Sequence, residues 1–202
     1  MSVRKESGAK MLRIGVYASG GGTNLQSLID ACKEGSLNGK VAAVISNNSK
    51  AHVLIRAANE NIPSYHLSGK THPEKGSLAK RMLEVFEENG TNLIILAGYM
   101  KLLPPEITKR YRDRILNVHP ALLPKYGGKG MYGQNVHKAV IEAGERISGA
   151  TVHFVDDVYD HGAILIQRTV PVMADDTPES LAARVLKVEH KILPMAAGIF
   201  LC

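Results

Sequence analysis

Two polar side chains end the apolar segment 115–119, and their chemical types suit the transfer of an acyl group. The segment reads Ile-Leu-Asn-Val-His and is followed by Pro120, which predicts a short buried strand that stops at once. Residues two positions apart in a strand point to the same face, so Asn117 and His119 would project together. An amide donor beside a group that titrates near neutral pH can hold an oxyanion and move a proton. The alternative is a core strand whose polar end residues satisfy loop backbone.

The glycine-rich segment 19–24, Ser-Gly-Gly-Gly-Thr-Asn, lies between an apolar strand and a helical pattern. Its backbone N–H groups and the positive end of the helix dipole would attract an anion. No Gly-Lys-Ser/Thr follows, so it is not a Walker A motif, and Leu25 stands where a dinucleotide fingerprint has its third glycine. The segment therefore predicts a phosphate site, with a tight turn that binds nothing as the alternative.

The acidic segment 156–162 joins the last two predicted strands and could bring a carboxylate to His119. A neighbouring anion favours the imidazolium and would raise the pKa of His119. Asp156 and Asp157 are typical of a solvated turn. A metal site is a further alternative, disfavoured because the ligand spacing of known metal motifs is missing. Its ligands would be His153, Asp156, Asp157 and His161.

Two more segments favour a binding site. Residues 125–133 contain four glycines in nine positions directly after the Asn-x-His-Pro sequence, which predicts a mobile loop over a site or else an ordinary surface loop. Residues 98–103 follow an apolar strand and would line a flat pocket or belong to the core.

The elements that must position these residues alternate between strand and helix. Helical spacing of apolar residues separates continuous apolar runs, which predict strands at residues 12–18, 41–45, 64–67, 93–97 and 115–119. Apolar strands separated by helices imply a parallel sheet covered on both faces. Two more strands, 150–155 and 163–170, are joined by a short loop and indicate an antiparallel edge. We expect a single-domain α/β fold over residues 11–202, after a flexible extension of residues 1–10, with ligands beyond the carboxyl ends of the strands.

Composition narrows the class of protein. The chain has 202 residues, a net charge of +6 and a pI of about 9.3, which suits anionic substrates, while its 5% of aromatic residues offers few stacking platforms for nucleic acid. The two cysteines, Cys32 and Cys202, indicate a reducing compartment and no catalytic or zinc role. No apolar run approaches 18 residues and no signal peptide is recognisable, so we expect a cytoplasmic protein without membrane contact.

In their order along the chain, these motifs resemble the phosphoribosylglycinamide formyltransferase family over about residues 12–200. The resemblance rests on Ser-Gly-Gly-Gly-Thr-Asn at 19–24, Leu-Ala-Gly-Tyr-Met-Lys-Leu-Leu at 96–103, Leu-Asn-Val-His-Pro-Ala-Leu-Leu-Pro at 116–124, Gly-Ala-Thr-Val-His-Phe-Val at 149–155, Asp-His-Gly at 160–162 and Glu-His at 189–190. It implies a Rossmann-related, formyltransferase-like fold.

The resemblance implies that the formyl group of 10-formyltetrahydrofolate, a co-substrate, is transferred to the amine of N1-(5-phospho-ribosyl)glycinamide in de novo purine (IMP) biosynthesis, without a metal. By motif position, the catalytic residues would be Asn117, His119 and Asp160. The residues that bind the ribonucleotide would be Gly22, Thr23, Asn24 and Glu189. The residues that bind folate would be Met100, Lys101, Leu102, Leu103, Asn117, Val155, Asp156 and Asp160, with Lys75 in the place of a folate-side arginine.

In that chemistry, Asn117 and a protonated His119 would donate to the oxyanion, while Asp160 supports the imidazolium and relays a proton. The alternative is another enzyme that uses 10-formyltetrahydrofolate on the same scaffold, such as formyltetrahydrofolate hydrolase or methionyl-tRNA formyltransferase. A third, less favoured class is a nucleic-acid or anion-binding module, suggested by the pI. Expected partners are small-molecule substrates only, with the chain a monomer or homodimer. Two departures from the family pattern are the extra glycines within 126–133 and an early end at Cys202.

Overall fold

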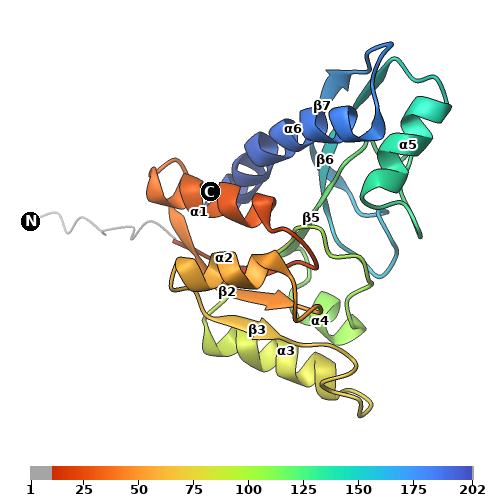
Figure 1. The fold of residues 1–202 in the computed structure, drawn as a ribbon. Coiled ribbons are helices and arrows are strands. Elements are labelled where there is room, and N and C mark those ends of the chain that lie inside the picture. The colour runs from red at the N-terminus through yellow and green to blue at the C-terminus, as the bar shows by residue number, and fades with distance from the viewer. Residues whose placement is uncertain (1–10, 202) are drawn as a thin grey trace, which may run out of the picture.

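Seven strands form one sheet across the molecule (Figure 1), in a computed structural model that describes residues 11–201. The strands are β1 (Leu12–Tyr17), β2 (Gly39–Ser46), β3 (Ser64–His66), β4 (Leu93–Leu96), β5 (Ile115–His119), β6 (Ile147–Phe154) and β7 (Ile164–Pro171). The helices are α1 (Thr23–Lys33), α2 (His52–Asn59), α3 (Ser77–Glu88), α4 (Pro105–Arg110), α5 (Gln134–Glu142), α6 (Pro178–Gly198) and the short 3₁₀ helix η1 (Ile199–Leu201). The extension predicted for residues 1–10 lies outside the described residues.

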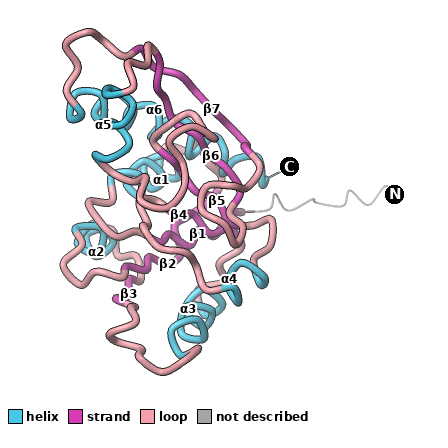
Figure 2. Tube along the Cα trace, turned by 90° about the vertical axis from the view of Figure 1, so that its right-hand side faces the viewer, coloured by secondary structure: helices cyan, strands magenta, loops and turns pink. Residues whose placement is uncertain are grey.

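The strand order is β3-β2-β1-β4-β5-β6-β7, which Figure 2 shows from one side. Strands β1 to β5 run parallel, and β6 and β7 complete the sheet as antiparallel strands. This confirms the predicted parallel sheet with an antiparallel edge. The chain lays down β2 and β3 on one side of β1 and then returns to place β4 on its other side. The carboxyl ends of β1 and β4 therefore flank a topological switch point, where open α/β sheets bind ligands.

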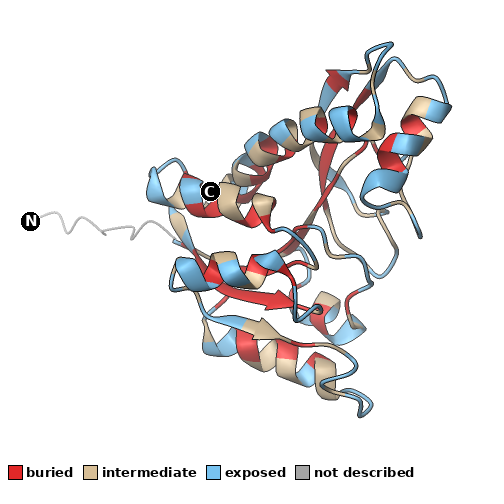
Figure 3. Cartoon of the chain, in the orientation of Figure 1, coloured by how far each residue is buried: buried red, intermediate tan, exposed pale blue. Residues whose placement is uncertain are grey.

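Helices cover both faces of the sheet, as the apolar runs predicted. On one face, α1, α2, α5 and α6 bury a cluster that includes Leu25, Leu28 and Leu193. On the other, α3 and α4 bury Met82, Phe86 and Ile107. Figure 3 shows the buried residues along the strands and on the inner sides of the helices. Within residues 11–201, no helix is both long and apolar enough to cross a lipid bilayer.

The start of α6 is fixed by local hydrogen bonds. The Thr177 side chain accepts from the Ser180 N–H at 3.2 Å, and the Ser180 hydroxyl accepts from the Thr177 N–H at 3.0 Å. Pro178, at the first turn, has no N–H to leave unsatisfied. Such a cap contributes about 1 kcal/mol. It sets where α6 begins, and this helix carries Glu189 towards the switch point.

Candidate active site

A cavity of about 590 Å³ lies beyond the carboxyl end of β5. Asn117, His119 and Asp160 line it and are called the first wall, and Asn24 with Glu189 of α6 also line it and are called the second wall. The glycine-rich segment 128–134 borders the same space, in keeping with the prediction that this loop covers a site. The cavity thus brings together residues from all five segments that the sequence singles out, which are 19–24, 98–103, 115–119, 125–133 and 156–162.

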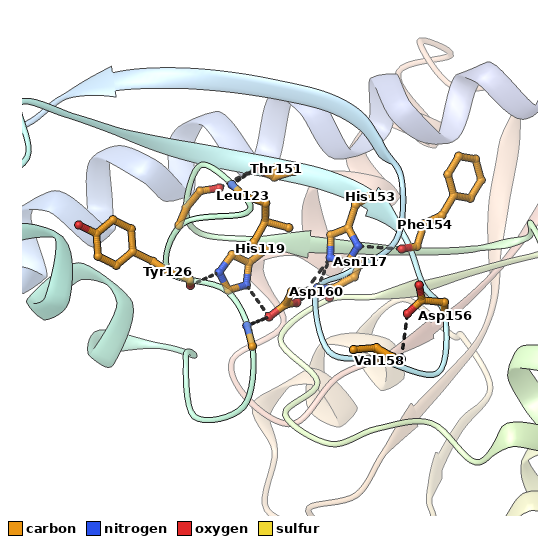
Figure 4. A network of polar contacts seen from close by, with 12 residues as sticks. Asn117, His119, Leu123, Tyr126, Thr151, His153, Phe154, Asp156, Val158 and Asp160 are labelled. Carbon is orange, nitrogen blue, oxygen red and sulfur yellow. Dashed lines mark hydrogen bonds and ion pairs between the residues drawn. The ribbon is translucent and has the colours of Figure 1, made fainter.

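Asn117, His119 and Asp160 form one polar network, drawn in Figure 4. The His119 Nδ1 atom lies 3.6 Å from Asp160 Oδ2, and the Asn117 amide donates to Asp160 Oδ1 at 3.4 Å. The backbone N–H of Gly128 donates to Asp160 Oδ2 at 2.9 Å, and His119 Nε2 donates to the Tyr126 carbonyl at 2.8 Å. The loop after Pro124 therefore contacts both the imidazole and the carboxylate.

The local backbone explains how the three side chains meet. Asn117 and His119 point to the same face of β5, as their spacing predicted, because β5 pairs regularly with both neighbours. Asp160 has a φ of 54°, a left-handed conformation that a non-glycine residue adopts at some energetic cost. Just after it, a Cβ on Gly162 would lie 1.9 Å from the Phe154 carbonyl oxygen. This close approach ties the 156–162 loop to the end of β6 and turns Asp160 into the cavity.

The protonation of His119 differs from the prediction. Burial lowers the pKa of His119 below its ordinary value of 6.5, and this outweighs the opposing effects of Asp160 and the Tyr126 carbonyl. Only 5% of the side chain is exposed, so the imidazolium loses nearly all of its hydration. The expectation that Asp160 keeps His119 charged is wrong for the free protein. At neutral pH, His119 is a neutral imidazole with its hydrogen on Nε2.

Asp160 is a carboxylate at neutral pH. Burial alone would raise the pKa of Asp160, but the surrounding donors, among them the Gly128 N–H, lower the pKa further than burial raises it. An ionised Asp160 beside a neutral imidazole is able to accept a proton, which the sequence-based chemistry requires of it.

The predicted phosphate loop is built as a helix start without a side-chain cap. Gly22 is the N-cap of α1, with a φ of 74°, and no side chain accepts from the first N–H groups of the helix. A Cβ on Gly22 would lie 2.9 Å from the Cα of Val53, so a glycine is required there for space as well as for conformation. Thr23 borders a separate groove between α1 and α6 instead of the cavity.

The Asn24 side chain is hydrogen-bonded to Glu189 of α6, another residue predicted to bind the ribonucleotide. Its Nδ2 donates to Glu189 Oε2 at 2.6 Å, and its Oδ1 is buried without a partner among the described residues. Burial raises the pKa of Glu189, and the hydrogen bond from Asn24 only partly offsets this. The start of α1 and helix α6 are thereby joined at the second wall of the cavity.

The residues predicted to bind folate divide between two adjoining spaces. Met100 borders the larger cavity. A second space of about 40 Å³ is lined by Lys101, Leu102, Leu103, Val155 and Asp156. Its volume is close to that of one water molecule, ~30 Å³. Tyr159 borders both spaces and its hydroxyl accepts from the Leu102 N–H at 3.2 Å, so a fused ring could enter the smaller space only if Tyr159 moved.

Other predicted residues are not brought to the site. Lys75 is exposed in the turn before α3 and lines neither space. The four residues of the metal alternative do not form one cluster: Asp157 accepts from the Thr108 hydroxyl at 2.6 Å, and only His161 and Asp156 pair with each other, on the surface. Among residues 11–201, no three His, Cys, Asp or Glu side chains gather as metal ligands do.

Three residues lie at the site although the sequence assigned them no role in formyl transfer. His153 lies opposite Asn117 in the β5–β6 pair, His137 of α5 lines the cavity near His119, and Tyr159 joins the two spaces. His153 alternates with Val152 and Phe154, so it lies on the opposite face of β6 from both of them. The register of β6 against β5 would be needed to place His153 beside Asn117.

The chain matches the family model described as formyl transferase over residues 12–197. A chloroplastic phosphoribosylglycinamide formyltransferase from Arabidopsis thaliana is 43% identical, with 92% of this chain and 64% of that protein aligned. A phosphoribosylglycinamide formyltransferase from Haemophilus influenzae is 41% identical, with 94% of this chain and 87% of that protein aligned. The crystal structure of glycinamide ribonucleotide transformylase 1 from Symbiobacterium toebii superposes with a TM-score of 0.88 at 39% identity and covers 95% of this chain and 88% of that chain.

The chain spans 64% and 61% of the length of two chloroplastic relatives, from Arabidopsis thaliana and Vigna unguiculata. The family model and the Haemophilus relative nevertheless cover nearly all of the described residues. The chain therefore belongs to the formyl transferase family, among the phosphoribosylglycinamide formyltransferases.

Proposed function

We propose that this protein transfers the formyl group of 10-formyltetrahydrofolate to the amine of N1-(5-phospho-ribosyl)glycinamide, a step in the synthesis of purines. The observation that carries the proposal is one cavity lined by Asn117, His119 and Asp160 and also by Asn24 with Glu189, beside the uncapped start of α1. Family membership supports the same substrates. The expected cytoplasmic location stays a prediction, since the Arabidopsis relative is named as chloroplastic.

The donors of the first wall suit the oxygen that becomes charged in the reaction. Attack of the amine on the formyl carbon turns the carbonyl oxygen into an oxyanion, which N–H groups stabilise in a dry site. Asn117 and the Nε2–H of His119 are such donors, and a neutral imidazole retains this one N–H. In the free protein that N–H donates to the Tyr126 carbonyl, so the formyl oxygen takes the place of the carbonyl when the site is occupied.

Asp160 moves the proton that the reaction releases. After attack, the amine nitrogen is positively charged and must lose a proton, while N10 of the folate needs one when its bond to the formyl carbon breaks. The Asp160 carboxylate takes the proton from the first nitrogen, and the Asp160–His119 pair returns it to the second. The proton balance closes without a covalent intermediate on the protein.

The second wall holds the other end of the acceptor. The uncapped N–H groups at the start of α1 suit the phosphate, since a helix N-terminus favours an anion. Glu189 Oε1 has no partner in the described residues and suits a ribose hydroxyl. Met100 and the space behind Tyr159 suit the folate ring.

The test mixes the protein with both substrates and follows the absorbance of the product folate. Asn117→Ala should lower turnover by about 10²–10³-fold. His119→Ala and Asp160→Asn should each lower it by about 10²–10⁴-fold. Asp157→Asn is the matched control, because this carboxylate of the same loop is exposed and lines neither space.

Near-normal turnover in any of the first three variants would remove that residue from the mechanism. Parallel reactions with water or tRNA in place of the ribonucleotide separate the proposed transfer from the alternatives. Faster consumption of 10-formyltetrahydrofolate with water alone would assign a hydrolase instead.

A further inference from the structure

His153 is a buried titratable residue without a part in the chemistry described so far. It lies on β6, next to the edge strand β7 and directly opposite Asn117 of β5, and only 2% of it is exposed. Side chains opposite each other in an antiparallel pair lie on the same face and interact. His153 therefore lies beside Asn117 (Figure 4); it does not line the larger cavity, but it borders the smaller space behind Tyr159.

The hydrogen bonds of its ring fix where the His153 proton lies. Nδ1 lies 2.7 Å from the carbonyl oxygen of Phe154, which can only accept, so Nδ1 carries a hydrogen. Nε2 lies 3.0 Å from the Nδ2 atom of Asn117. A bare Nε2 accepts from that amide, and the neutral Nδ1–H form satisfies both contacts.

The same contacts decide which way the Asn117 amide faces. An asparagine side chain has a donor end and an acceptor end of nearly equal size, which exchange on a rotation of 180°. One hydrogen of Nδ2 is held by His153 Nε2, and the other is directed at Asp160 Oδ1 over a long 3.4 Å. In the reversed orientation the Asn117 oxygen would face a bare nitrogen and a carboxylate, which are both acceptors.

We propose that His153 is a positioning residue that holds the Asn117 amide with its N–H groups, and not its C=O, towards the reacting formyl oxygen. The inference rests on the proposed function. The strong hydrogen bond to His153 uses one N–H, and the weakly held second N–H is free to leave Asp160 for an oxyanion. Without His153, only Asp160 would select the orientation, and the reversed amide would present an oxygen that repels the oxyanion.

The competing arrangement has an Nε2–H on His153 that donates to Asp160, whose Oδ1 lies 3.5 Å away. It requires a doubly protonated ring, since Nδ1 still faces the Phe154 carbonyl. It also turns the Asn117 oxygen towards His153, where it would lie next to Asp160 Oδ1. His153 would then act on Asp160 and not on Asn117, and the experiments below distinguish the two arrangements.

The first experiment does not depend on activity. Nitrogen-15 NMR of the protein labelled in histidine, with a His153→Gln variant to assign the signals, reports which ring nitrogen of His153 carries hydrogen at pH 7.5. The Nδ1–H form is expected. An Nε2–H or doubly protonated ring would overturn the proposal, and this reading stands even if the protein does not transfer formyl groups.

The second experiment is a double-mutant cycle on turnover. His153→Phe keeps a ring but removes the acceptor, and should lower kcat by about 10–10²-fold, less than loss of the donor itself, with both KM values within about threefold. In an Asn117→Ala background it should have no further effect, because its whole effect passes through that amide. His153→Gln should recover part of kcat, since its side-chain oxygen can accept near the position of Nε2.

An equal loss in both backgrounds, or a change in KM alone, would refute the role. His66→Phe on strand β3, at the other edge of the sheet, is the control and should keep full turnover. If His153→Phe does not fold, the cycle is run with His153→Gln. If the wild-type protein transfers no formyl group at all, the proposed function fails, and the NMR result still decides the orientation.

Discussion

Replacement of Glu189 by glutamine should make this protein more stable at neutral pH. Glu189 is 8% exposed, and its single hydrogen bond within the described residues comes from Asn24 at 2.6 Å. A carboxylate in that position has lost its hydration, and a single hydrogen bond replaces the lost contacts with water. Glutamine has nearly the same shape, can accept the same hydrogen bond through its oxygen and has no charge to bury.

The size and the sign of the effect follow from the burial. A buried polar group without adequate partners costs about 1–3 kcal/mol, and for a chain of this length each kcal/mol shifts Tm by about 2–4 °C. Burial raises the pKa of Glu189 above its ordinary value of 4.5. The folded state therefore binds the proton more tightly, and the wild type loses stability as pH rises through the folded pKa. The gain of Glu189→Gln should be near zero below pH ~4.5 and increase above it.

Urea unfolding of both proteins at several pH values between 4 and 8 measures this difference directly. Glu142→Gln is the control, because that carboxylate is exposed in an ion pair with Lys138 and should change stability by less than about 0.5 kcal/mol at any pH. A gain for Glu189→Gln that is the same at pH 4 and pH 8, or a loss at pH 8, would refute the argument from buried charge. The same variant should bind the ribonucleotide more weakly.

Two further outcomes are expected. The unfolding free energy should fall as pH drops below about 6.5, because burial lowers the pKa values of His119 and His137 in the folded protein. The unfolded chain then binds protons more readily than the folded protein does. Equal stability at pH 7.5 and 5.5 would contradict this. Gly22→Ala should destabilise the protein by about 1–3 kcal/mol and raise the KM for the ribonucleotide. A Cβ at this position would lie 2.9 Å from the Val53 Cα, and the backbone φ is 74°. An unchanged Tm and KM would show that the loop has room for the methyl group.

The fold follows from the sequence because its signals are local. Strands buried on both faces read as unbroken apolar runs, and Thr177-Pro178 marks the start of α6 by the chemistry of a helix cap. Asn117 and His119 were likewise found from spacing within one strand. What depends on distant segments was missed: the partner of Asn117 is 36 residues further along the chain, in a register that no local pattern fixes.

The charge of His119 was misjudged for a related reason. The sequence reveals that an acid can be near, but the extent of burial is known only after the whole chain has folded, and here burial has the larger effect on the pKa. Asn24 shows the same limit, because its partner Glu189 lies 165 residues away.

The Tyr126 carbonyl and the Gly128 N–H occupy, in the resting protein, the places on His119 and Asp160 that reactants need. Arrival of the reactants is then an exchange of partners, in which each new hydrogen bond replaces an old one and the net enthalpy gained at the reacting centre is small. In the proposed reaction, affinity would have to come from the phosphate of the ribonucleotide and the ring of the folate, at the two ends of the site. An inhibitor that fills only the middle of the site would compete with the protein's own backbone and should bind poorly. An inhibitor that reaches both the phosphate site and the ring site would gain its affinity there.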